Sequence, residues 1–412
     1  MKDAKLQWKR NIILYITSQT ISLFGSSLVQ YAIMWYITLE TKSGLMMTIS
    51  ILCGFLPTLL LAPFAGVWAD RYNRKVLIML SDSLIALSTL FIAVVFLMGY
   101  KEMWLLFVVQ IVRALGTAVH APSSSAFIPQ MVPEALLTKV NATNSSIQSV
   151  TMLISPMVSG ALMSLAPIES IFFIDVLTAI IGVSTLLIFL KVPPHEKAMQ
   201  KQTVSHLEDL RLGFDYIRKH DYVMAFFLFS GIMLFLAATP AFLTPLQVTR
   251  SFGSDVWRLT AVEISFSLGM IFGGIGMVYW GGFRNRVHTM ILSLAMLGFF
   301  TIMLGVMTNF WVYLVFMAFI GVSLPMFNTP AMVLLQEKVE ENYLGRVFSV
   351  LTMISSSMMP LGMVIFGPLS DVIDIEWLLI LTGCLTVFEC VFMFRHKVLV
   401  AAGEPLKIEE IG

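Results

Sequence analysis

Charged side chains are scarce in this chain. Asp, Glu, Lys and Arg make up 12% of its 412 residues, against about 25% in a typical soluble domain. Residues 11–39 and 43–69 contain no charge at all, and each run exceeds the roughly 20 residues that cross a bilayer as a helix. Because backbone groups in lipid must be paired within their own segment, the sequence predicts an all-α membrane protein.

Other scarce features exclude further classes of function. The three cysteines, Cys53, Cys384 and Cys390, all lie in apolar segments and suggest neither a disulfide framework nor a zinc site. The sequence contains no clustered set of His and acidic residues for a metal, and no Walker A sequence. A net charge of +1 gives no reason to expect nucleic acid as a partner. We therefore expect neither an enzyme nor a bound cofactor or metal.

Charges and turn residues divide the chain into twelve candidate spans. Most Lys and Arg residues fall in alternate connections, and the opposite connections hold only Lys42, Lys101, Arg250 and Arg258. Since positive charge marks the cytoplasmic side, we expect both termini in the cytoplasm. We expect the membrane to be a bacterial cell membrane. The spans are expected near residues 11–39, 43–69, 76–100, 103–127, 144–166, 168–190, 222–248, 257–281, 288–308, 309–335, 346–369 and 375–395.

A long polar interval separates the spans into two halves. Inside it, Leu207, Leu210, Phe214 and Ile217 follow a helical spacing and predict an amphipathic helix at the membrane surface. The predicted domains are an N-terminal six-helix bundle (1–190), a cytoplasmic linker (191–221), a C-terminal six-helix bundle (222–395) and a cytoplasmic tail (396–412).

The two halves carry an internal repeat. Residues 132–140 read VPEALLTKV and residues 339–347 read VEENYLGRV, each after the fourth span of its half. At nearly the same offset two further triplets align: Trp68, Asn73 and Arg74 with Trp280, Asn285 and Arg286. Two such repeats around a central cavity are the general design of secondary transporters.

The connection after the second span, residues 66–75, reads GVWADRYNRK. It resembles the loop signature of the major facilitator superfamily, which usually has Gly in place of Asn73. The resemblance implies that Asp70 caps the start of span 11, where partial positive charge collects, and latches the halves on the cytoplasmic side. The alternative is that these charges only fix the topology. The residues assigned to this latch are Gly66, Asp70, Arg71, Arg74, Lys75, Gly345 and Arg346.

Span 5 carries SPMVSG at residues 155–160. This stretch resembles the family's antiporter motif, with Ser155 and Ser159 in place of two glycines. Small residues let helices approach closely, so Ser155, Pro156, Ser159 and Gly160 are expected to form a close-packed seam. Generic helix packing is compatible with this interpretation. Span 8 offers a possible partner face of small residues: Gly269, Gly273, Gly274 and Gly276.

Segments spread over both halves, including VRALGTAVHAP, EISFSLGM and QEKVEENYLGRVFS, resemble the macrolide-efflux branch of the drug exporters. The resemblance implies a major facilitator fold that exports an amphipathic small molecule by proton antiport. We expect a monomer surrounded by lipid. The alternatives are a lipid or lysolipid flippase, an exporter of another small molecule, and a membrane-embedded sensor or enzyme.

Polar residues inside the spans are the candidates for proton coupling. Span 4 carries Arg113, and an intramembrane charge is usually functional. His120 on the same helix is expected to titrate or to bond to a neighbouring helix. Glu263 is the preferred coupling acid, with Asp175 second and Arg113 as a coupling arginine. Two other intramembrane acids, Asp82 and Glu389, are expected to snorkel or to pair with basic residues in the loops.

Proline interrupts span 7 at Pro240 and Pro245, and span 10 at Pro325 and Pro330. We expect these helices to bend, either as gates or as bent structural helices. The chain's 28 Met and 31 Phe residues suit varied apolar ligands. The candidate cavity residues are Gln30, Met34, Arg113, Thr117, His120, Phe235, Phe266, Phe327 and Asn328.

Overall fold

The computed structural model describes residues 2–133, 136–190 and 206–404. The first part of the predicted linker (191–205), Glu134 of the repeat and the tail from Pro405 onward lie outside the described residues. Throughout the described part the regular structure is helical, and twelve helices are long and apolar enough to cross a membrane. The predicted fold class, all-α with twelve spans, is confirmed.

The helices follow the apolar runs of the sequence, and short polar connections separate them. Six belong to the first half of the chain: α1 (Lys2–Thr41), α2 (Gly44–Arg71), α3 (Arg74–Leu97), α4 (Met103–Met131), α5 (Leu137–Leu165) and α6 (Ile168–Phe189). The second half contains α7 (His206–Lys219), α8 (Asp221–Ala238), η3 (Thr239–Leu243), α9 (Thr244–Ser251), α10 (Val256–Trp280), α11 (Arg286–Val306), α12 (Phe310–Lys338), α13 (Glu341–Leu369), α14 (Ile375–Arg395) and α15 (Lys397–Ala402).

The chain divides into two compact units. The first comprises Met1–Thr41 and Ile49–Gln202, and the second comprises Lys42–Thr48 and Thr203–Gly412. The change from the first unit to the second near residue 202 lies inside the interval predicted as a linker. The short stretch Lys42–Thr48, which includes the first turn of α2, belongs with the second unit, whereas the sequence places it in the first half.

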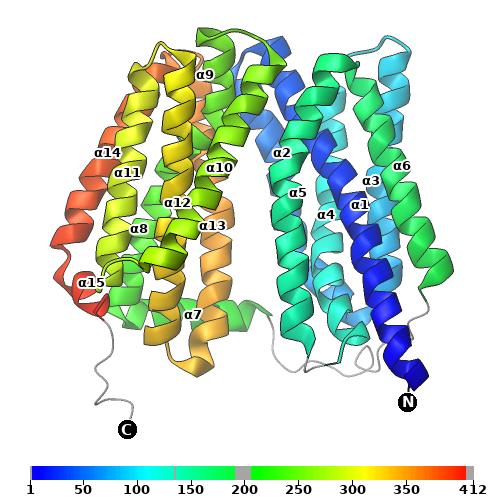
Figure 1. Cartoon of the computed structure of the whole chain (residues 1–412), viewed down its shortest axis with the longest axis horizontal. Helices are drawn as coiled ribbons and strands as arrows, with labels where there is room; N and C mark the ends of the chain where they lie inside the picture. Colours follow the sequence, from blue (N-terminus) through cyan, green and yellow to red (C-terminus); the bar gives the residue numbers. More distant parts are fainter. Residues whose placement is uncertain (1, 134–135, 191–205, 405–412) are drawn as a thin grey trace. The chain divides into compact units, whose positions relative to one another are not determined.

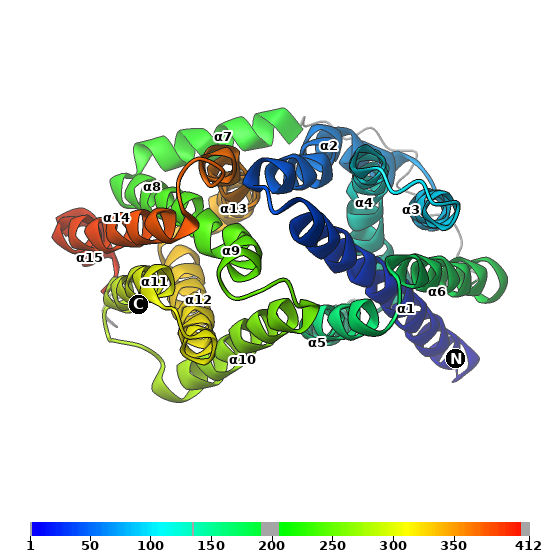
Figure 2. The same cartoon turned by 90° about the horizontal axis from the view of Figure 1, so that it is seen from above.

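In the first unit, α1 packs against α5 and α6, and α3 packs against α4 and α6 (Figure 1). Buried residues from α1, α3, α4 and α6 form one core cluster, which includes Tyr15, Ile78, Phe127 and Leu186. In the second unit, α10 and α11 flank α12, α11 packs on α14, and α8 packs on α13 (Figure 2).

Glycines set the distance between α10 and α12. A Cβ atom added at Gly269 would overlap the carbonyl oxygen of Ala318, and one added at Gly273 would lie 2.6 Å from the carbonyl oxygen of Val322. Gly274 and Gly276 have no heavy atom within 4 Å of the same position. Half of the predicted small face of span 8 therefore packs on span 10 within its own unit.

An asparagine caps the start of the third membrane span of each half, α3 and α11. The Asn73 side chain accepts a hydrogen bond from the Lys75 N–H, and the Asn285 side chain accepts one from the Val287 N–H, both at 3.0 Å. A side-chain oxygen at this position satisfies one of the unpaired N–H groups of the first turn. The repeat seen in the sequence thus corresponds to a repeated N-cap.

Span 7 is not a plain bent helix at its prolines. Residues Thr239–Leu243 form one π-helical segment between α8 and α9, and the Thr244 hydroxyl donates to the Pro240 carbonyl. Such segments relieve the missing proline N–H by widening the turn, and they are frequent at functional sites. Pro325 and Pro330 of span 10 are accommodated inside the continuous helix α12.

The amphipathic helix predicted in the linker is α7. Its residues Tyr216 and Ile217 are buried, and the Tyr216 ring stacks on Tyr343 of α13 with 4.6 Å between ring centroids. Phe214 is 40% exposed. Among the described residues of the predicted apolar face, Ile217 is therefore covered and Phe214 is exposed.

Candidate functional site

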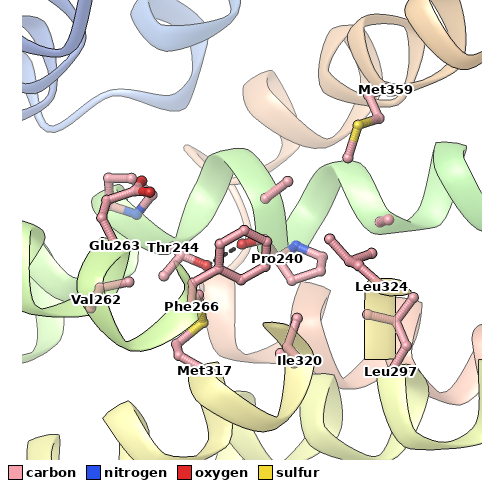
Figure 3. A pocket seen from close by; sticks show the side chains of 13 residues that line it. Pro240, Thr244, Val262, Glu263, Phe266, Leu297, Met317, Ile320, Leu324 and Met359 are labelled. Carbon is pink, nitrogen blue, oxygen red and sulfur yellow. Dashed lines mark hydrogen bonds between the residues drawn. The ribbon is translucent and has the colours of Figure 1, made fainter. Parts of the chain in front are cut away.

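An apolar cavity of about 120 Å³ lies within the second unit. The π segment and α9 form one wall with Pro240 and Thr244, and α10 contributes Glu263 and Phe266. Figure 3 shows Glu263 at one end of this cavity, Phe266 and Pro240 in the middle, and Leu297 and Leu324 at the other end. The remaining lining residues are Ala237, Ala241, Pro245, Val262, Met317, Ile320 and Met359.

Glu263 is the one carboxyl group in this lining. It forms no hydrogen bond or ion pair with any residue that the structure describes, and its neighbours in the cavity wall are mostly apolar. A carboxylate in such surroundings has no fixed positive charge to offset its loss of water. It can be neutralised by a proton or by a cationic ligand that enters the cavity.

Arg113 and Asp175, two other candidates from the sequence, are brought together in the first unit. Arg113 Nη1 lies 2.6 Å from Asp175 Oδ2, and both side chains are buried. The same carboxylate accepts hydrogen bonds from the Thr89 and Ser26 hydroxyls at 2.9 Å. Asp175 is therefore fully partnered, in contrast to Glu263.

In the first unit, His120 of α4 lies beside Gln19 of α1 and Asp82 of α3. His120 Nε2 is 2.7 Å from Gln19 Oε1 and 3.5 Å from Asp82 Oδ1. Asp82 is 4% exposed and pairs with no loop base among the described residues, so the expectation that it snorkels or pairs with the loops is wrong. Glu389 is likewise buried, at 5% exposure, and joins no ion pair in the described chain.

The loop signature has contacts of its own within the first unit. Arg74 lies 3.6 Å from Asp70 and donates to the carbonyl oxygens of Ala69 and Ala126. Lys75 Nζ donates to the Leu190 carbonyl at 2.7 Å, which ties the start of α3 to the end of α6. Gly66 is partly buried and Arg71 is exposed. The latch with Gly345 and Arg346 would join the two units and stays a prediction.

The antiporter-like motif forms a close seam inside the first unit. Ser155, Pro156, Ser159 and Gly160 are all buried on α5. The Ser159 hydroxyl donates to the Leu28 carbonyl of α1 at 3.0 Å. Small side chains at these positions thus allow α5 to approach the backbone of α1.

The other candidate cavity residues are dispersed. Gln30, Thr117 and Asn328 are exposed, Met34 and Phe235 are partly buried, and Phe327 is buried. Phe235 packs on Phe366 with 5.4 Å between ring centroids. Of this set, Phe266 alone lines the cavity described above.

Sequence reasoning did not find a polar cluster at the first turn of α2. Asp371, which follows α13, accepts hydrogen bonds from the Gly44 and Leu45 N–H groups at 2.8 and 2.9 Å and from the Ser43 hydroxyl at 2.7 Å. Arg250 of α9 donates to the same carboxylate at 2.8 Å and to the Lys42 carbonyl at 2.6 Å. The signal available was the pair of charges, one acid and one base, in connections that hold few charges.

Most of the chain matches a known protein family. Residues 15–363, and in a second match residues 283–410, match the Major Facilitator Superfamily. The chain is 30% identical over 382 residues to macrolide efflux protein A of Streptococcus pyogenes, covering 92% of this chain and 94% of that protein. It is 31% identical over 323 residues to macrolide efflux protein A of Enterococcus faecalis, covering 78% of this chain and 99% of that protein.

Solved structures agree on the fold. A bacterial homologue of the iron transporter ferroportin, in an inward-facing state, superposes with a TM-score of 0.70 at 15% identity and covers 94% of this chain and 98% of that one. At this identity the likeness shows the fold alone. With the family match over most of its length, the chain belongs to the Major Facilitator Superfamily and is a multi-pass membrane transporter related to macrolide efflux proteins, not an enzyme.

Proposed function

We propose that this transporter exports amphipathic compounds, macrolide-like antibiotics first among them, by proton antiport and alternating access. The observation that carries the proposal is Glu263, an unpartnered carboxyl group at one end of an apolar cavity. The relatives named macrolide efflux protein A supply the cargo class. The positive-inside pattern supports export from a cytoplasm that holds both termini.

Competition for one carboxylate explains how cargo and proton would be exchanged. Macrolide-like drugs combine a large apolar ring with an amine that is protonated at neutral pH. The apolar wall of Phe266 and Met317 suits the ring, and Glu263 suits either the ammonium group or a proton. Because both cannot be bound to the carboxylate at once, drug release on the outside requires protonation there, and proton release inside permits drug binding.

The π segment supports a gating role for span 7. Pro240 lies in the π segment and Pro245 in the first turn of α9, and each proline leaves a carbonyl group without its usual intrahelical donor. Both prolines line the cavity together with Glu263. A helix with such a break bends at a defined place. A ligand that binds one bent form more tightly than the other would shift the equilibrium between them.

The proposal is tested by drug accumulation in cells that express the transporter. A panel of radiolabelled antibiotics is supplied with and without a protonophore to the wild type, Glu263→Gln and Asp255→Asn. Asp255 is an exposed acid at the start of the same helix and serves as the matched control. We expect protonophore-sensitive exclusion of macrolides by the wild type and Asp255→Asn, and accumulation in Glu263→Gln at equal membrane abundance. The proposal would be refuted if cells with Glu263→Gln still excluded macrolides. It would also be refuted if the protonophore did not reduce macrolide exclusion by the wild type.

A further inference from the structure

A second group of buried titratable side chains lies in the first unit, separate from Glu263. Asp82 of α3, His120 of α4 and Gln19 of α1 are each no more than 5% exposed. Gln19 Nε2 donates to Asp82 Oδ2 at 3.3 Å, and its Oε1 lies 2.7 Å from His120 Nε2. His120 Nε2 is also 3.5 Å from Asp82 Oδ1. Three helices therefore converge on one carboxylate and one imidazole.

The charged groups around this cluster do not neutralise it. Asp175 of α6 acts electrostatically on Asp82, but Arg113 offsets its charge at 2.6 Å. Tyr15 of α1 is also within electrostatic reach, and its hydroxyl is engaged with Ser124 at 2.7 Å. In the described chain no Lys or Arg pairs with Asp82. The net charge of the cluster is therefore set by the protons on Asp82 and His120 themselves.

We infer that Asp82, Gln19 and His120 form a proton-binding site in the first unit. With a neutral imidazole and an ionised carboxylate the cluster carries one negative charge. One added proton makes it neutral, either as an imidazolium–carboxylate pair or as a carboxylic acid beside a neutral ring. An uncompensated charge at membrane depth is costly, and the carboxylate and imidazole lie close enough to share one added proton. Both facts favour reversible binding of a single proton.

Helix α1 connects this site with the neighbouring ion pair. Gln19 contacts Asp82 and His120, and Ser26, two turns further along α1, donates to Asp175 at 2.9 Å. Arg113 also donates to the Ser26 carbonyl at 3.0 Å. A change in the protonation of Asp82 alters the hydrogen bonds that Gln19 makes, so α1 is the element that would respond. This inference rests on the proposed proton antiport and adds a second carrier to Glu263.

The test uses the purified full-length protein in lipid nanodiscs. Infrared difference spectra recorded on stepping the pH report carboxyl protonation, and proton uptake is counted by titration. The variants are Asp82→Asn and His120→Gln, with Glu263→Gln and the exposed-acid variant Asp255→Asn as controls. Reconstituted transport of a macrolide is measured across the same pH range. His120→Gln keeps Asp82 in place, so it provides a readout if Asp82→Asn folds poorly.

We expect Asp82→Asn to lose one proton-binding step and His120→Gln to move that step along the pH axis, while Glu263→Gln retains it. We also expect both variants at the site to flatten the pH profile of transport. Titration curves of Asp82→Asn and His120→Gln that superpose on the wild-type curve would overturn the inference. If the wild type shows the Asp82 step but moves no macrolide, the proposed function fails and the proton site stands.

An independent observation concerns the first turn of α2. Besides the hydrogen bonds to Asp371, this turn is pressed against α13: the Gly44 position lies against the Gly367 carbonyl, and the Thr48 hydroxyl donates to the Met363 carbonyl at 3.1 Å. We propose that Asp371 and Arg250 form a releasable cap on α2 at the end predicted to face outside. Asp371 thus follows α13 and caps the start of α2. The sequence predicts a comparable cap on the cytoplasmic side, where Asp70 is expected to cap the start of span 11.

The bonds of this cap suit repeated breaking and forming. The Asp371 and Arg250 side chains are 28% and 30% exposed, so water can replace their partners. A carboxylate at a helix start is stabilised by the N–H groups and dipole of the first turn. Loss of the cap leaves the N–H groups of Gly44 and Leu45 to solvent, which favours release of the turn from α13.

Cysteine accessibility tests the cap. Thr48 is 3% exposed, so a Thr48→Cys variant lacking the three native cysteines reports opening through its labelling rate with a membrane-impermeant maleimide. We expect faster labelling during drug turnover and in the added variant Asp371→Asn, but not in Asp374→Asn, an exposed acid in the same connection. Equal labelling rates at rest, during turnover and with Asp371→Asn would overturn the proposal.

Discussion

Arg113 of α4 and Asp175 of α6 form a buried ion pair, with 2.6 Å between Nη1 and Oδ2 and with 7% and 0% of the side chains exposed. The Thr89 and Ser26 hydroxyls complete the surroundings of the carboxylate. Asp175 thus has a countercharge and two hydroxyl donors, whereas Glu263 has no such partner in the described chain. For the proposed proton antiport we therefore expect Glu263, rather than the ion-paired Asp175, to be the exchanging acid.

The buried Arg113–Asp175 pair predicts a large loss of stability when one partner is removed, and a partly exposed pair predicts a small one. Asp175→Asn leaves the Arg113 guanidinium buried without a countercharge, and we expect a loss of about 3–5 kcal/mol in the free energy of unfolding. The partly exposed pair Arg258–Asp255, at 3.1 Å, is the control, and Asp255→Asn at the 58% exposed partner is expected to change stability by no more than about 1 kcal/mol. Thermal unfolding of the purified variants in detergent measures both. Equal losses of stability from the two substitutions would contradict the conclusion that the Arg113–Asp175 pair is buried.

The crossing of α10 and α12 provides a matched pair of glycines. Gly269→Ala places a methyl group onto the Ala318 carbonyl, so we expect destabilisation of about 1–3 kcal/mol from overpacking. Gly274→Ala adds the same group where no atom lies within 4 Å, and the better helix propensity of Ala predicts a gain of up to about 1 kcal/mol. Thermal unfolding separates the two variants. If the Gly269→Ala variant were as stable as the wild type, α10 and α12 would not be in close contact at this position.

The Asp371 cap predicts a specific pH dependence. Partial burial alone would raise the pKa of Asp371, but the N–H groups of Leu45 and Gly44, the Ser43 hydroxyl and the Arg250 guanidinium together hold it below its ordinary value. The cap therefore contributes fully above the ordinary pKa of about 3.9 and is lost as the pH falls through the lower, folded-state pKa.

We expect Asp371→Asn to lower the stability of the protein by about 1.5–3 kcal/mol at neutral pH, as for hydrogen bonds to a charged group. The difference from the wild type should stay constant from pH 8 to pH 5 and shrink only at more acidic pH. Unfolding temperatures of the wild type and Asp371→Asn, measured across this pH range, show whether the stability difference changes with pH in this direction. A difference that shrinks as the pH rises from 5 to 8 would contradict it.

The sequence was sufficient for the spans and the repeat because both depend on local composition. Long uncharged runs can only be helices in lipid, and Asn73 and Asn285 cap equivalent helices because an asparagine oxygen satisfies the first-turn N–H groups wherever it begins a helix. The π segment at Thr239–Leu243 was expected only as a bend, because proline position does not determine how the freed carbonyls are satisfied.

The site was less accessible to sequence reasoning because its partners are distant in the chain. Asp82 and His120 are 38 positions apart, and only the packing of α3 on α4 brings them to 3.5 Å. The partnering of Arg113 with Asp175 likewise depends on which faces of α4 and α6 meet. Glu263, the preferred coupling acid of the sequence analysis, lies in the cavity lining, and its role in proton coupling stays a prediction.

The most direct test of the central claim is proton movement driven by cargo in inside-out membrane vesicles. Respiration acidifies the vesicle interior, and a pH-sensitive dye follows the gradient while a macrolide is added outside. We predict that the drug dissipates part of the gradient in vesicles with the wild-type transporter and leaves it unchanged with Glu263→Gln. Macrolide uptake into wild-type vesicles with no change in the gradient would contradict proton antiport.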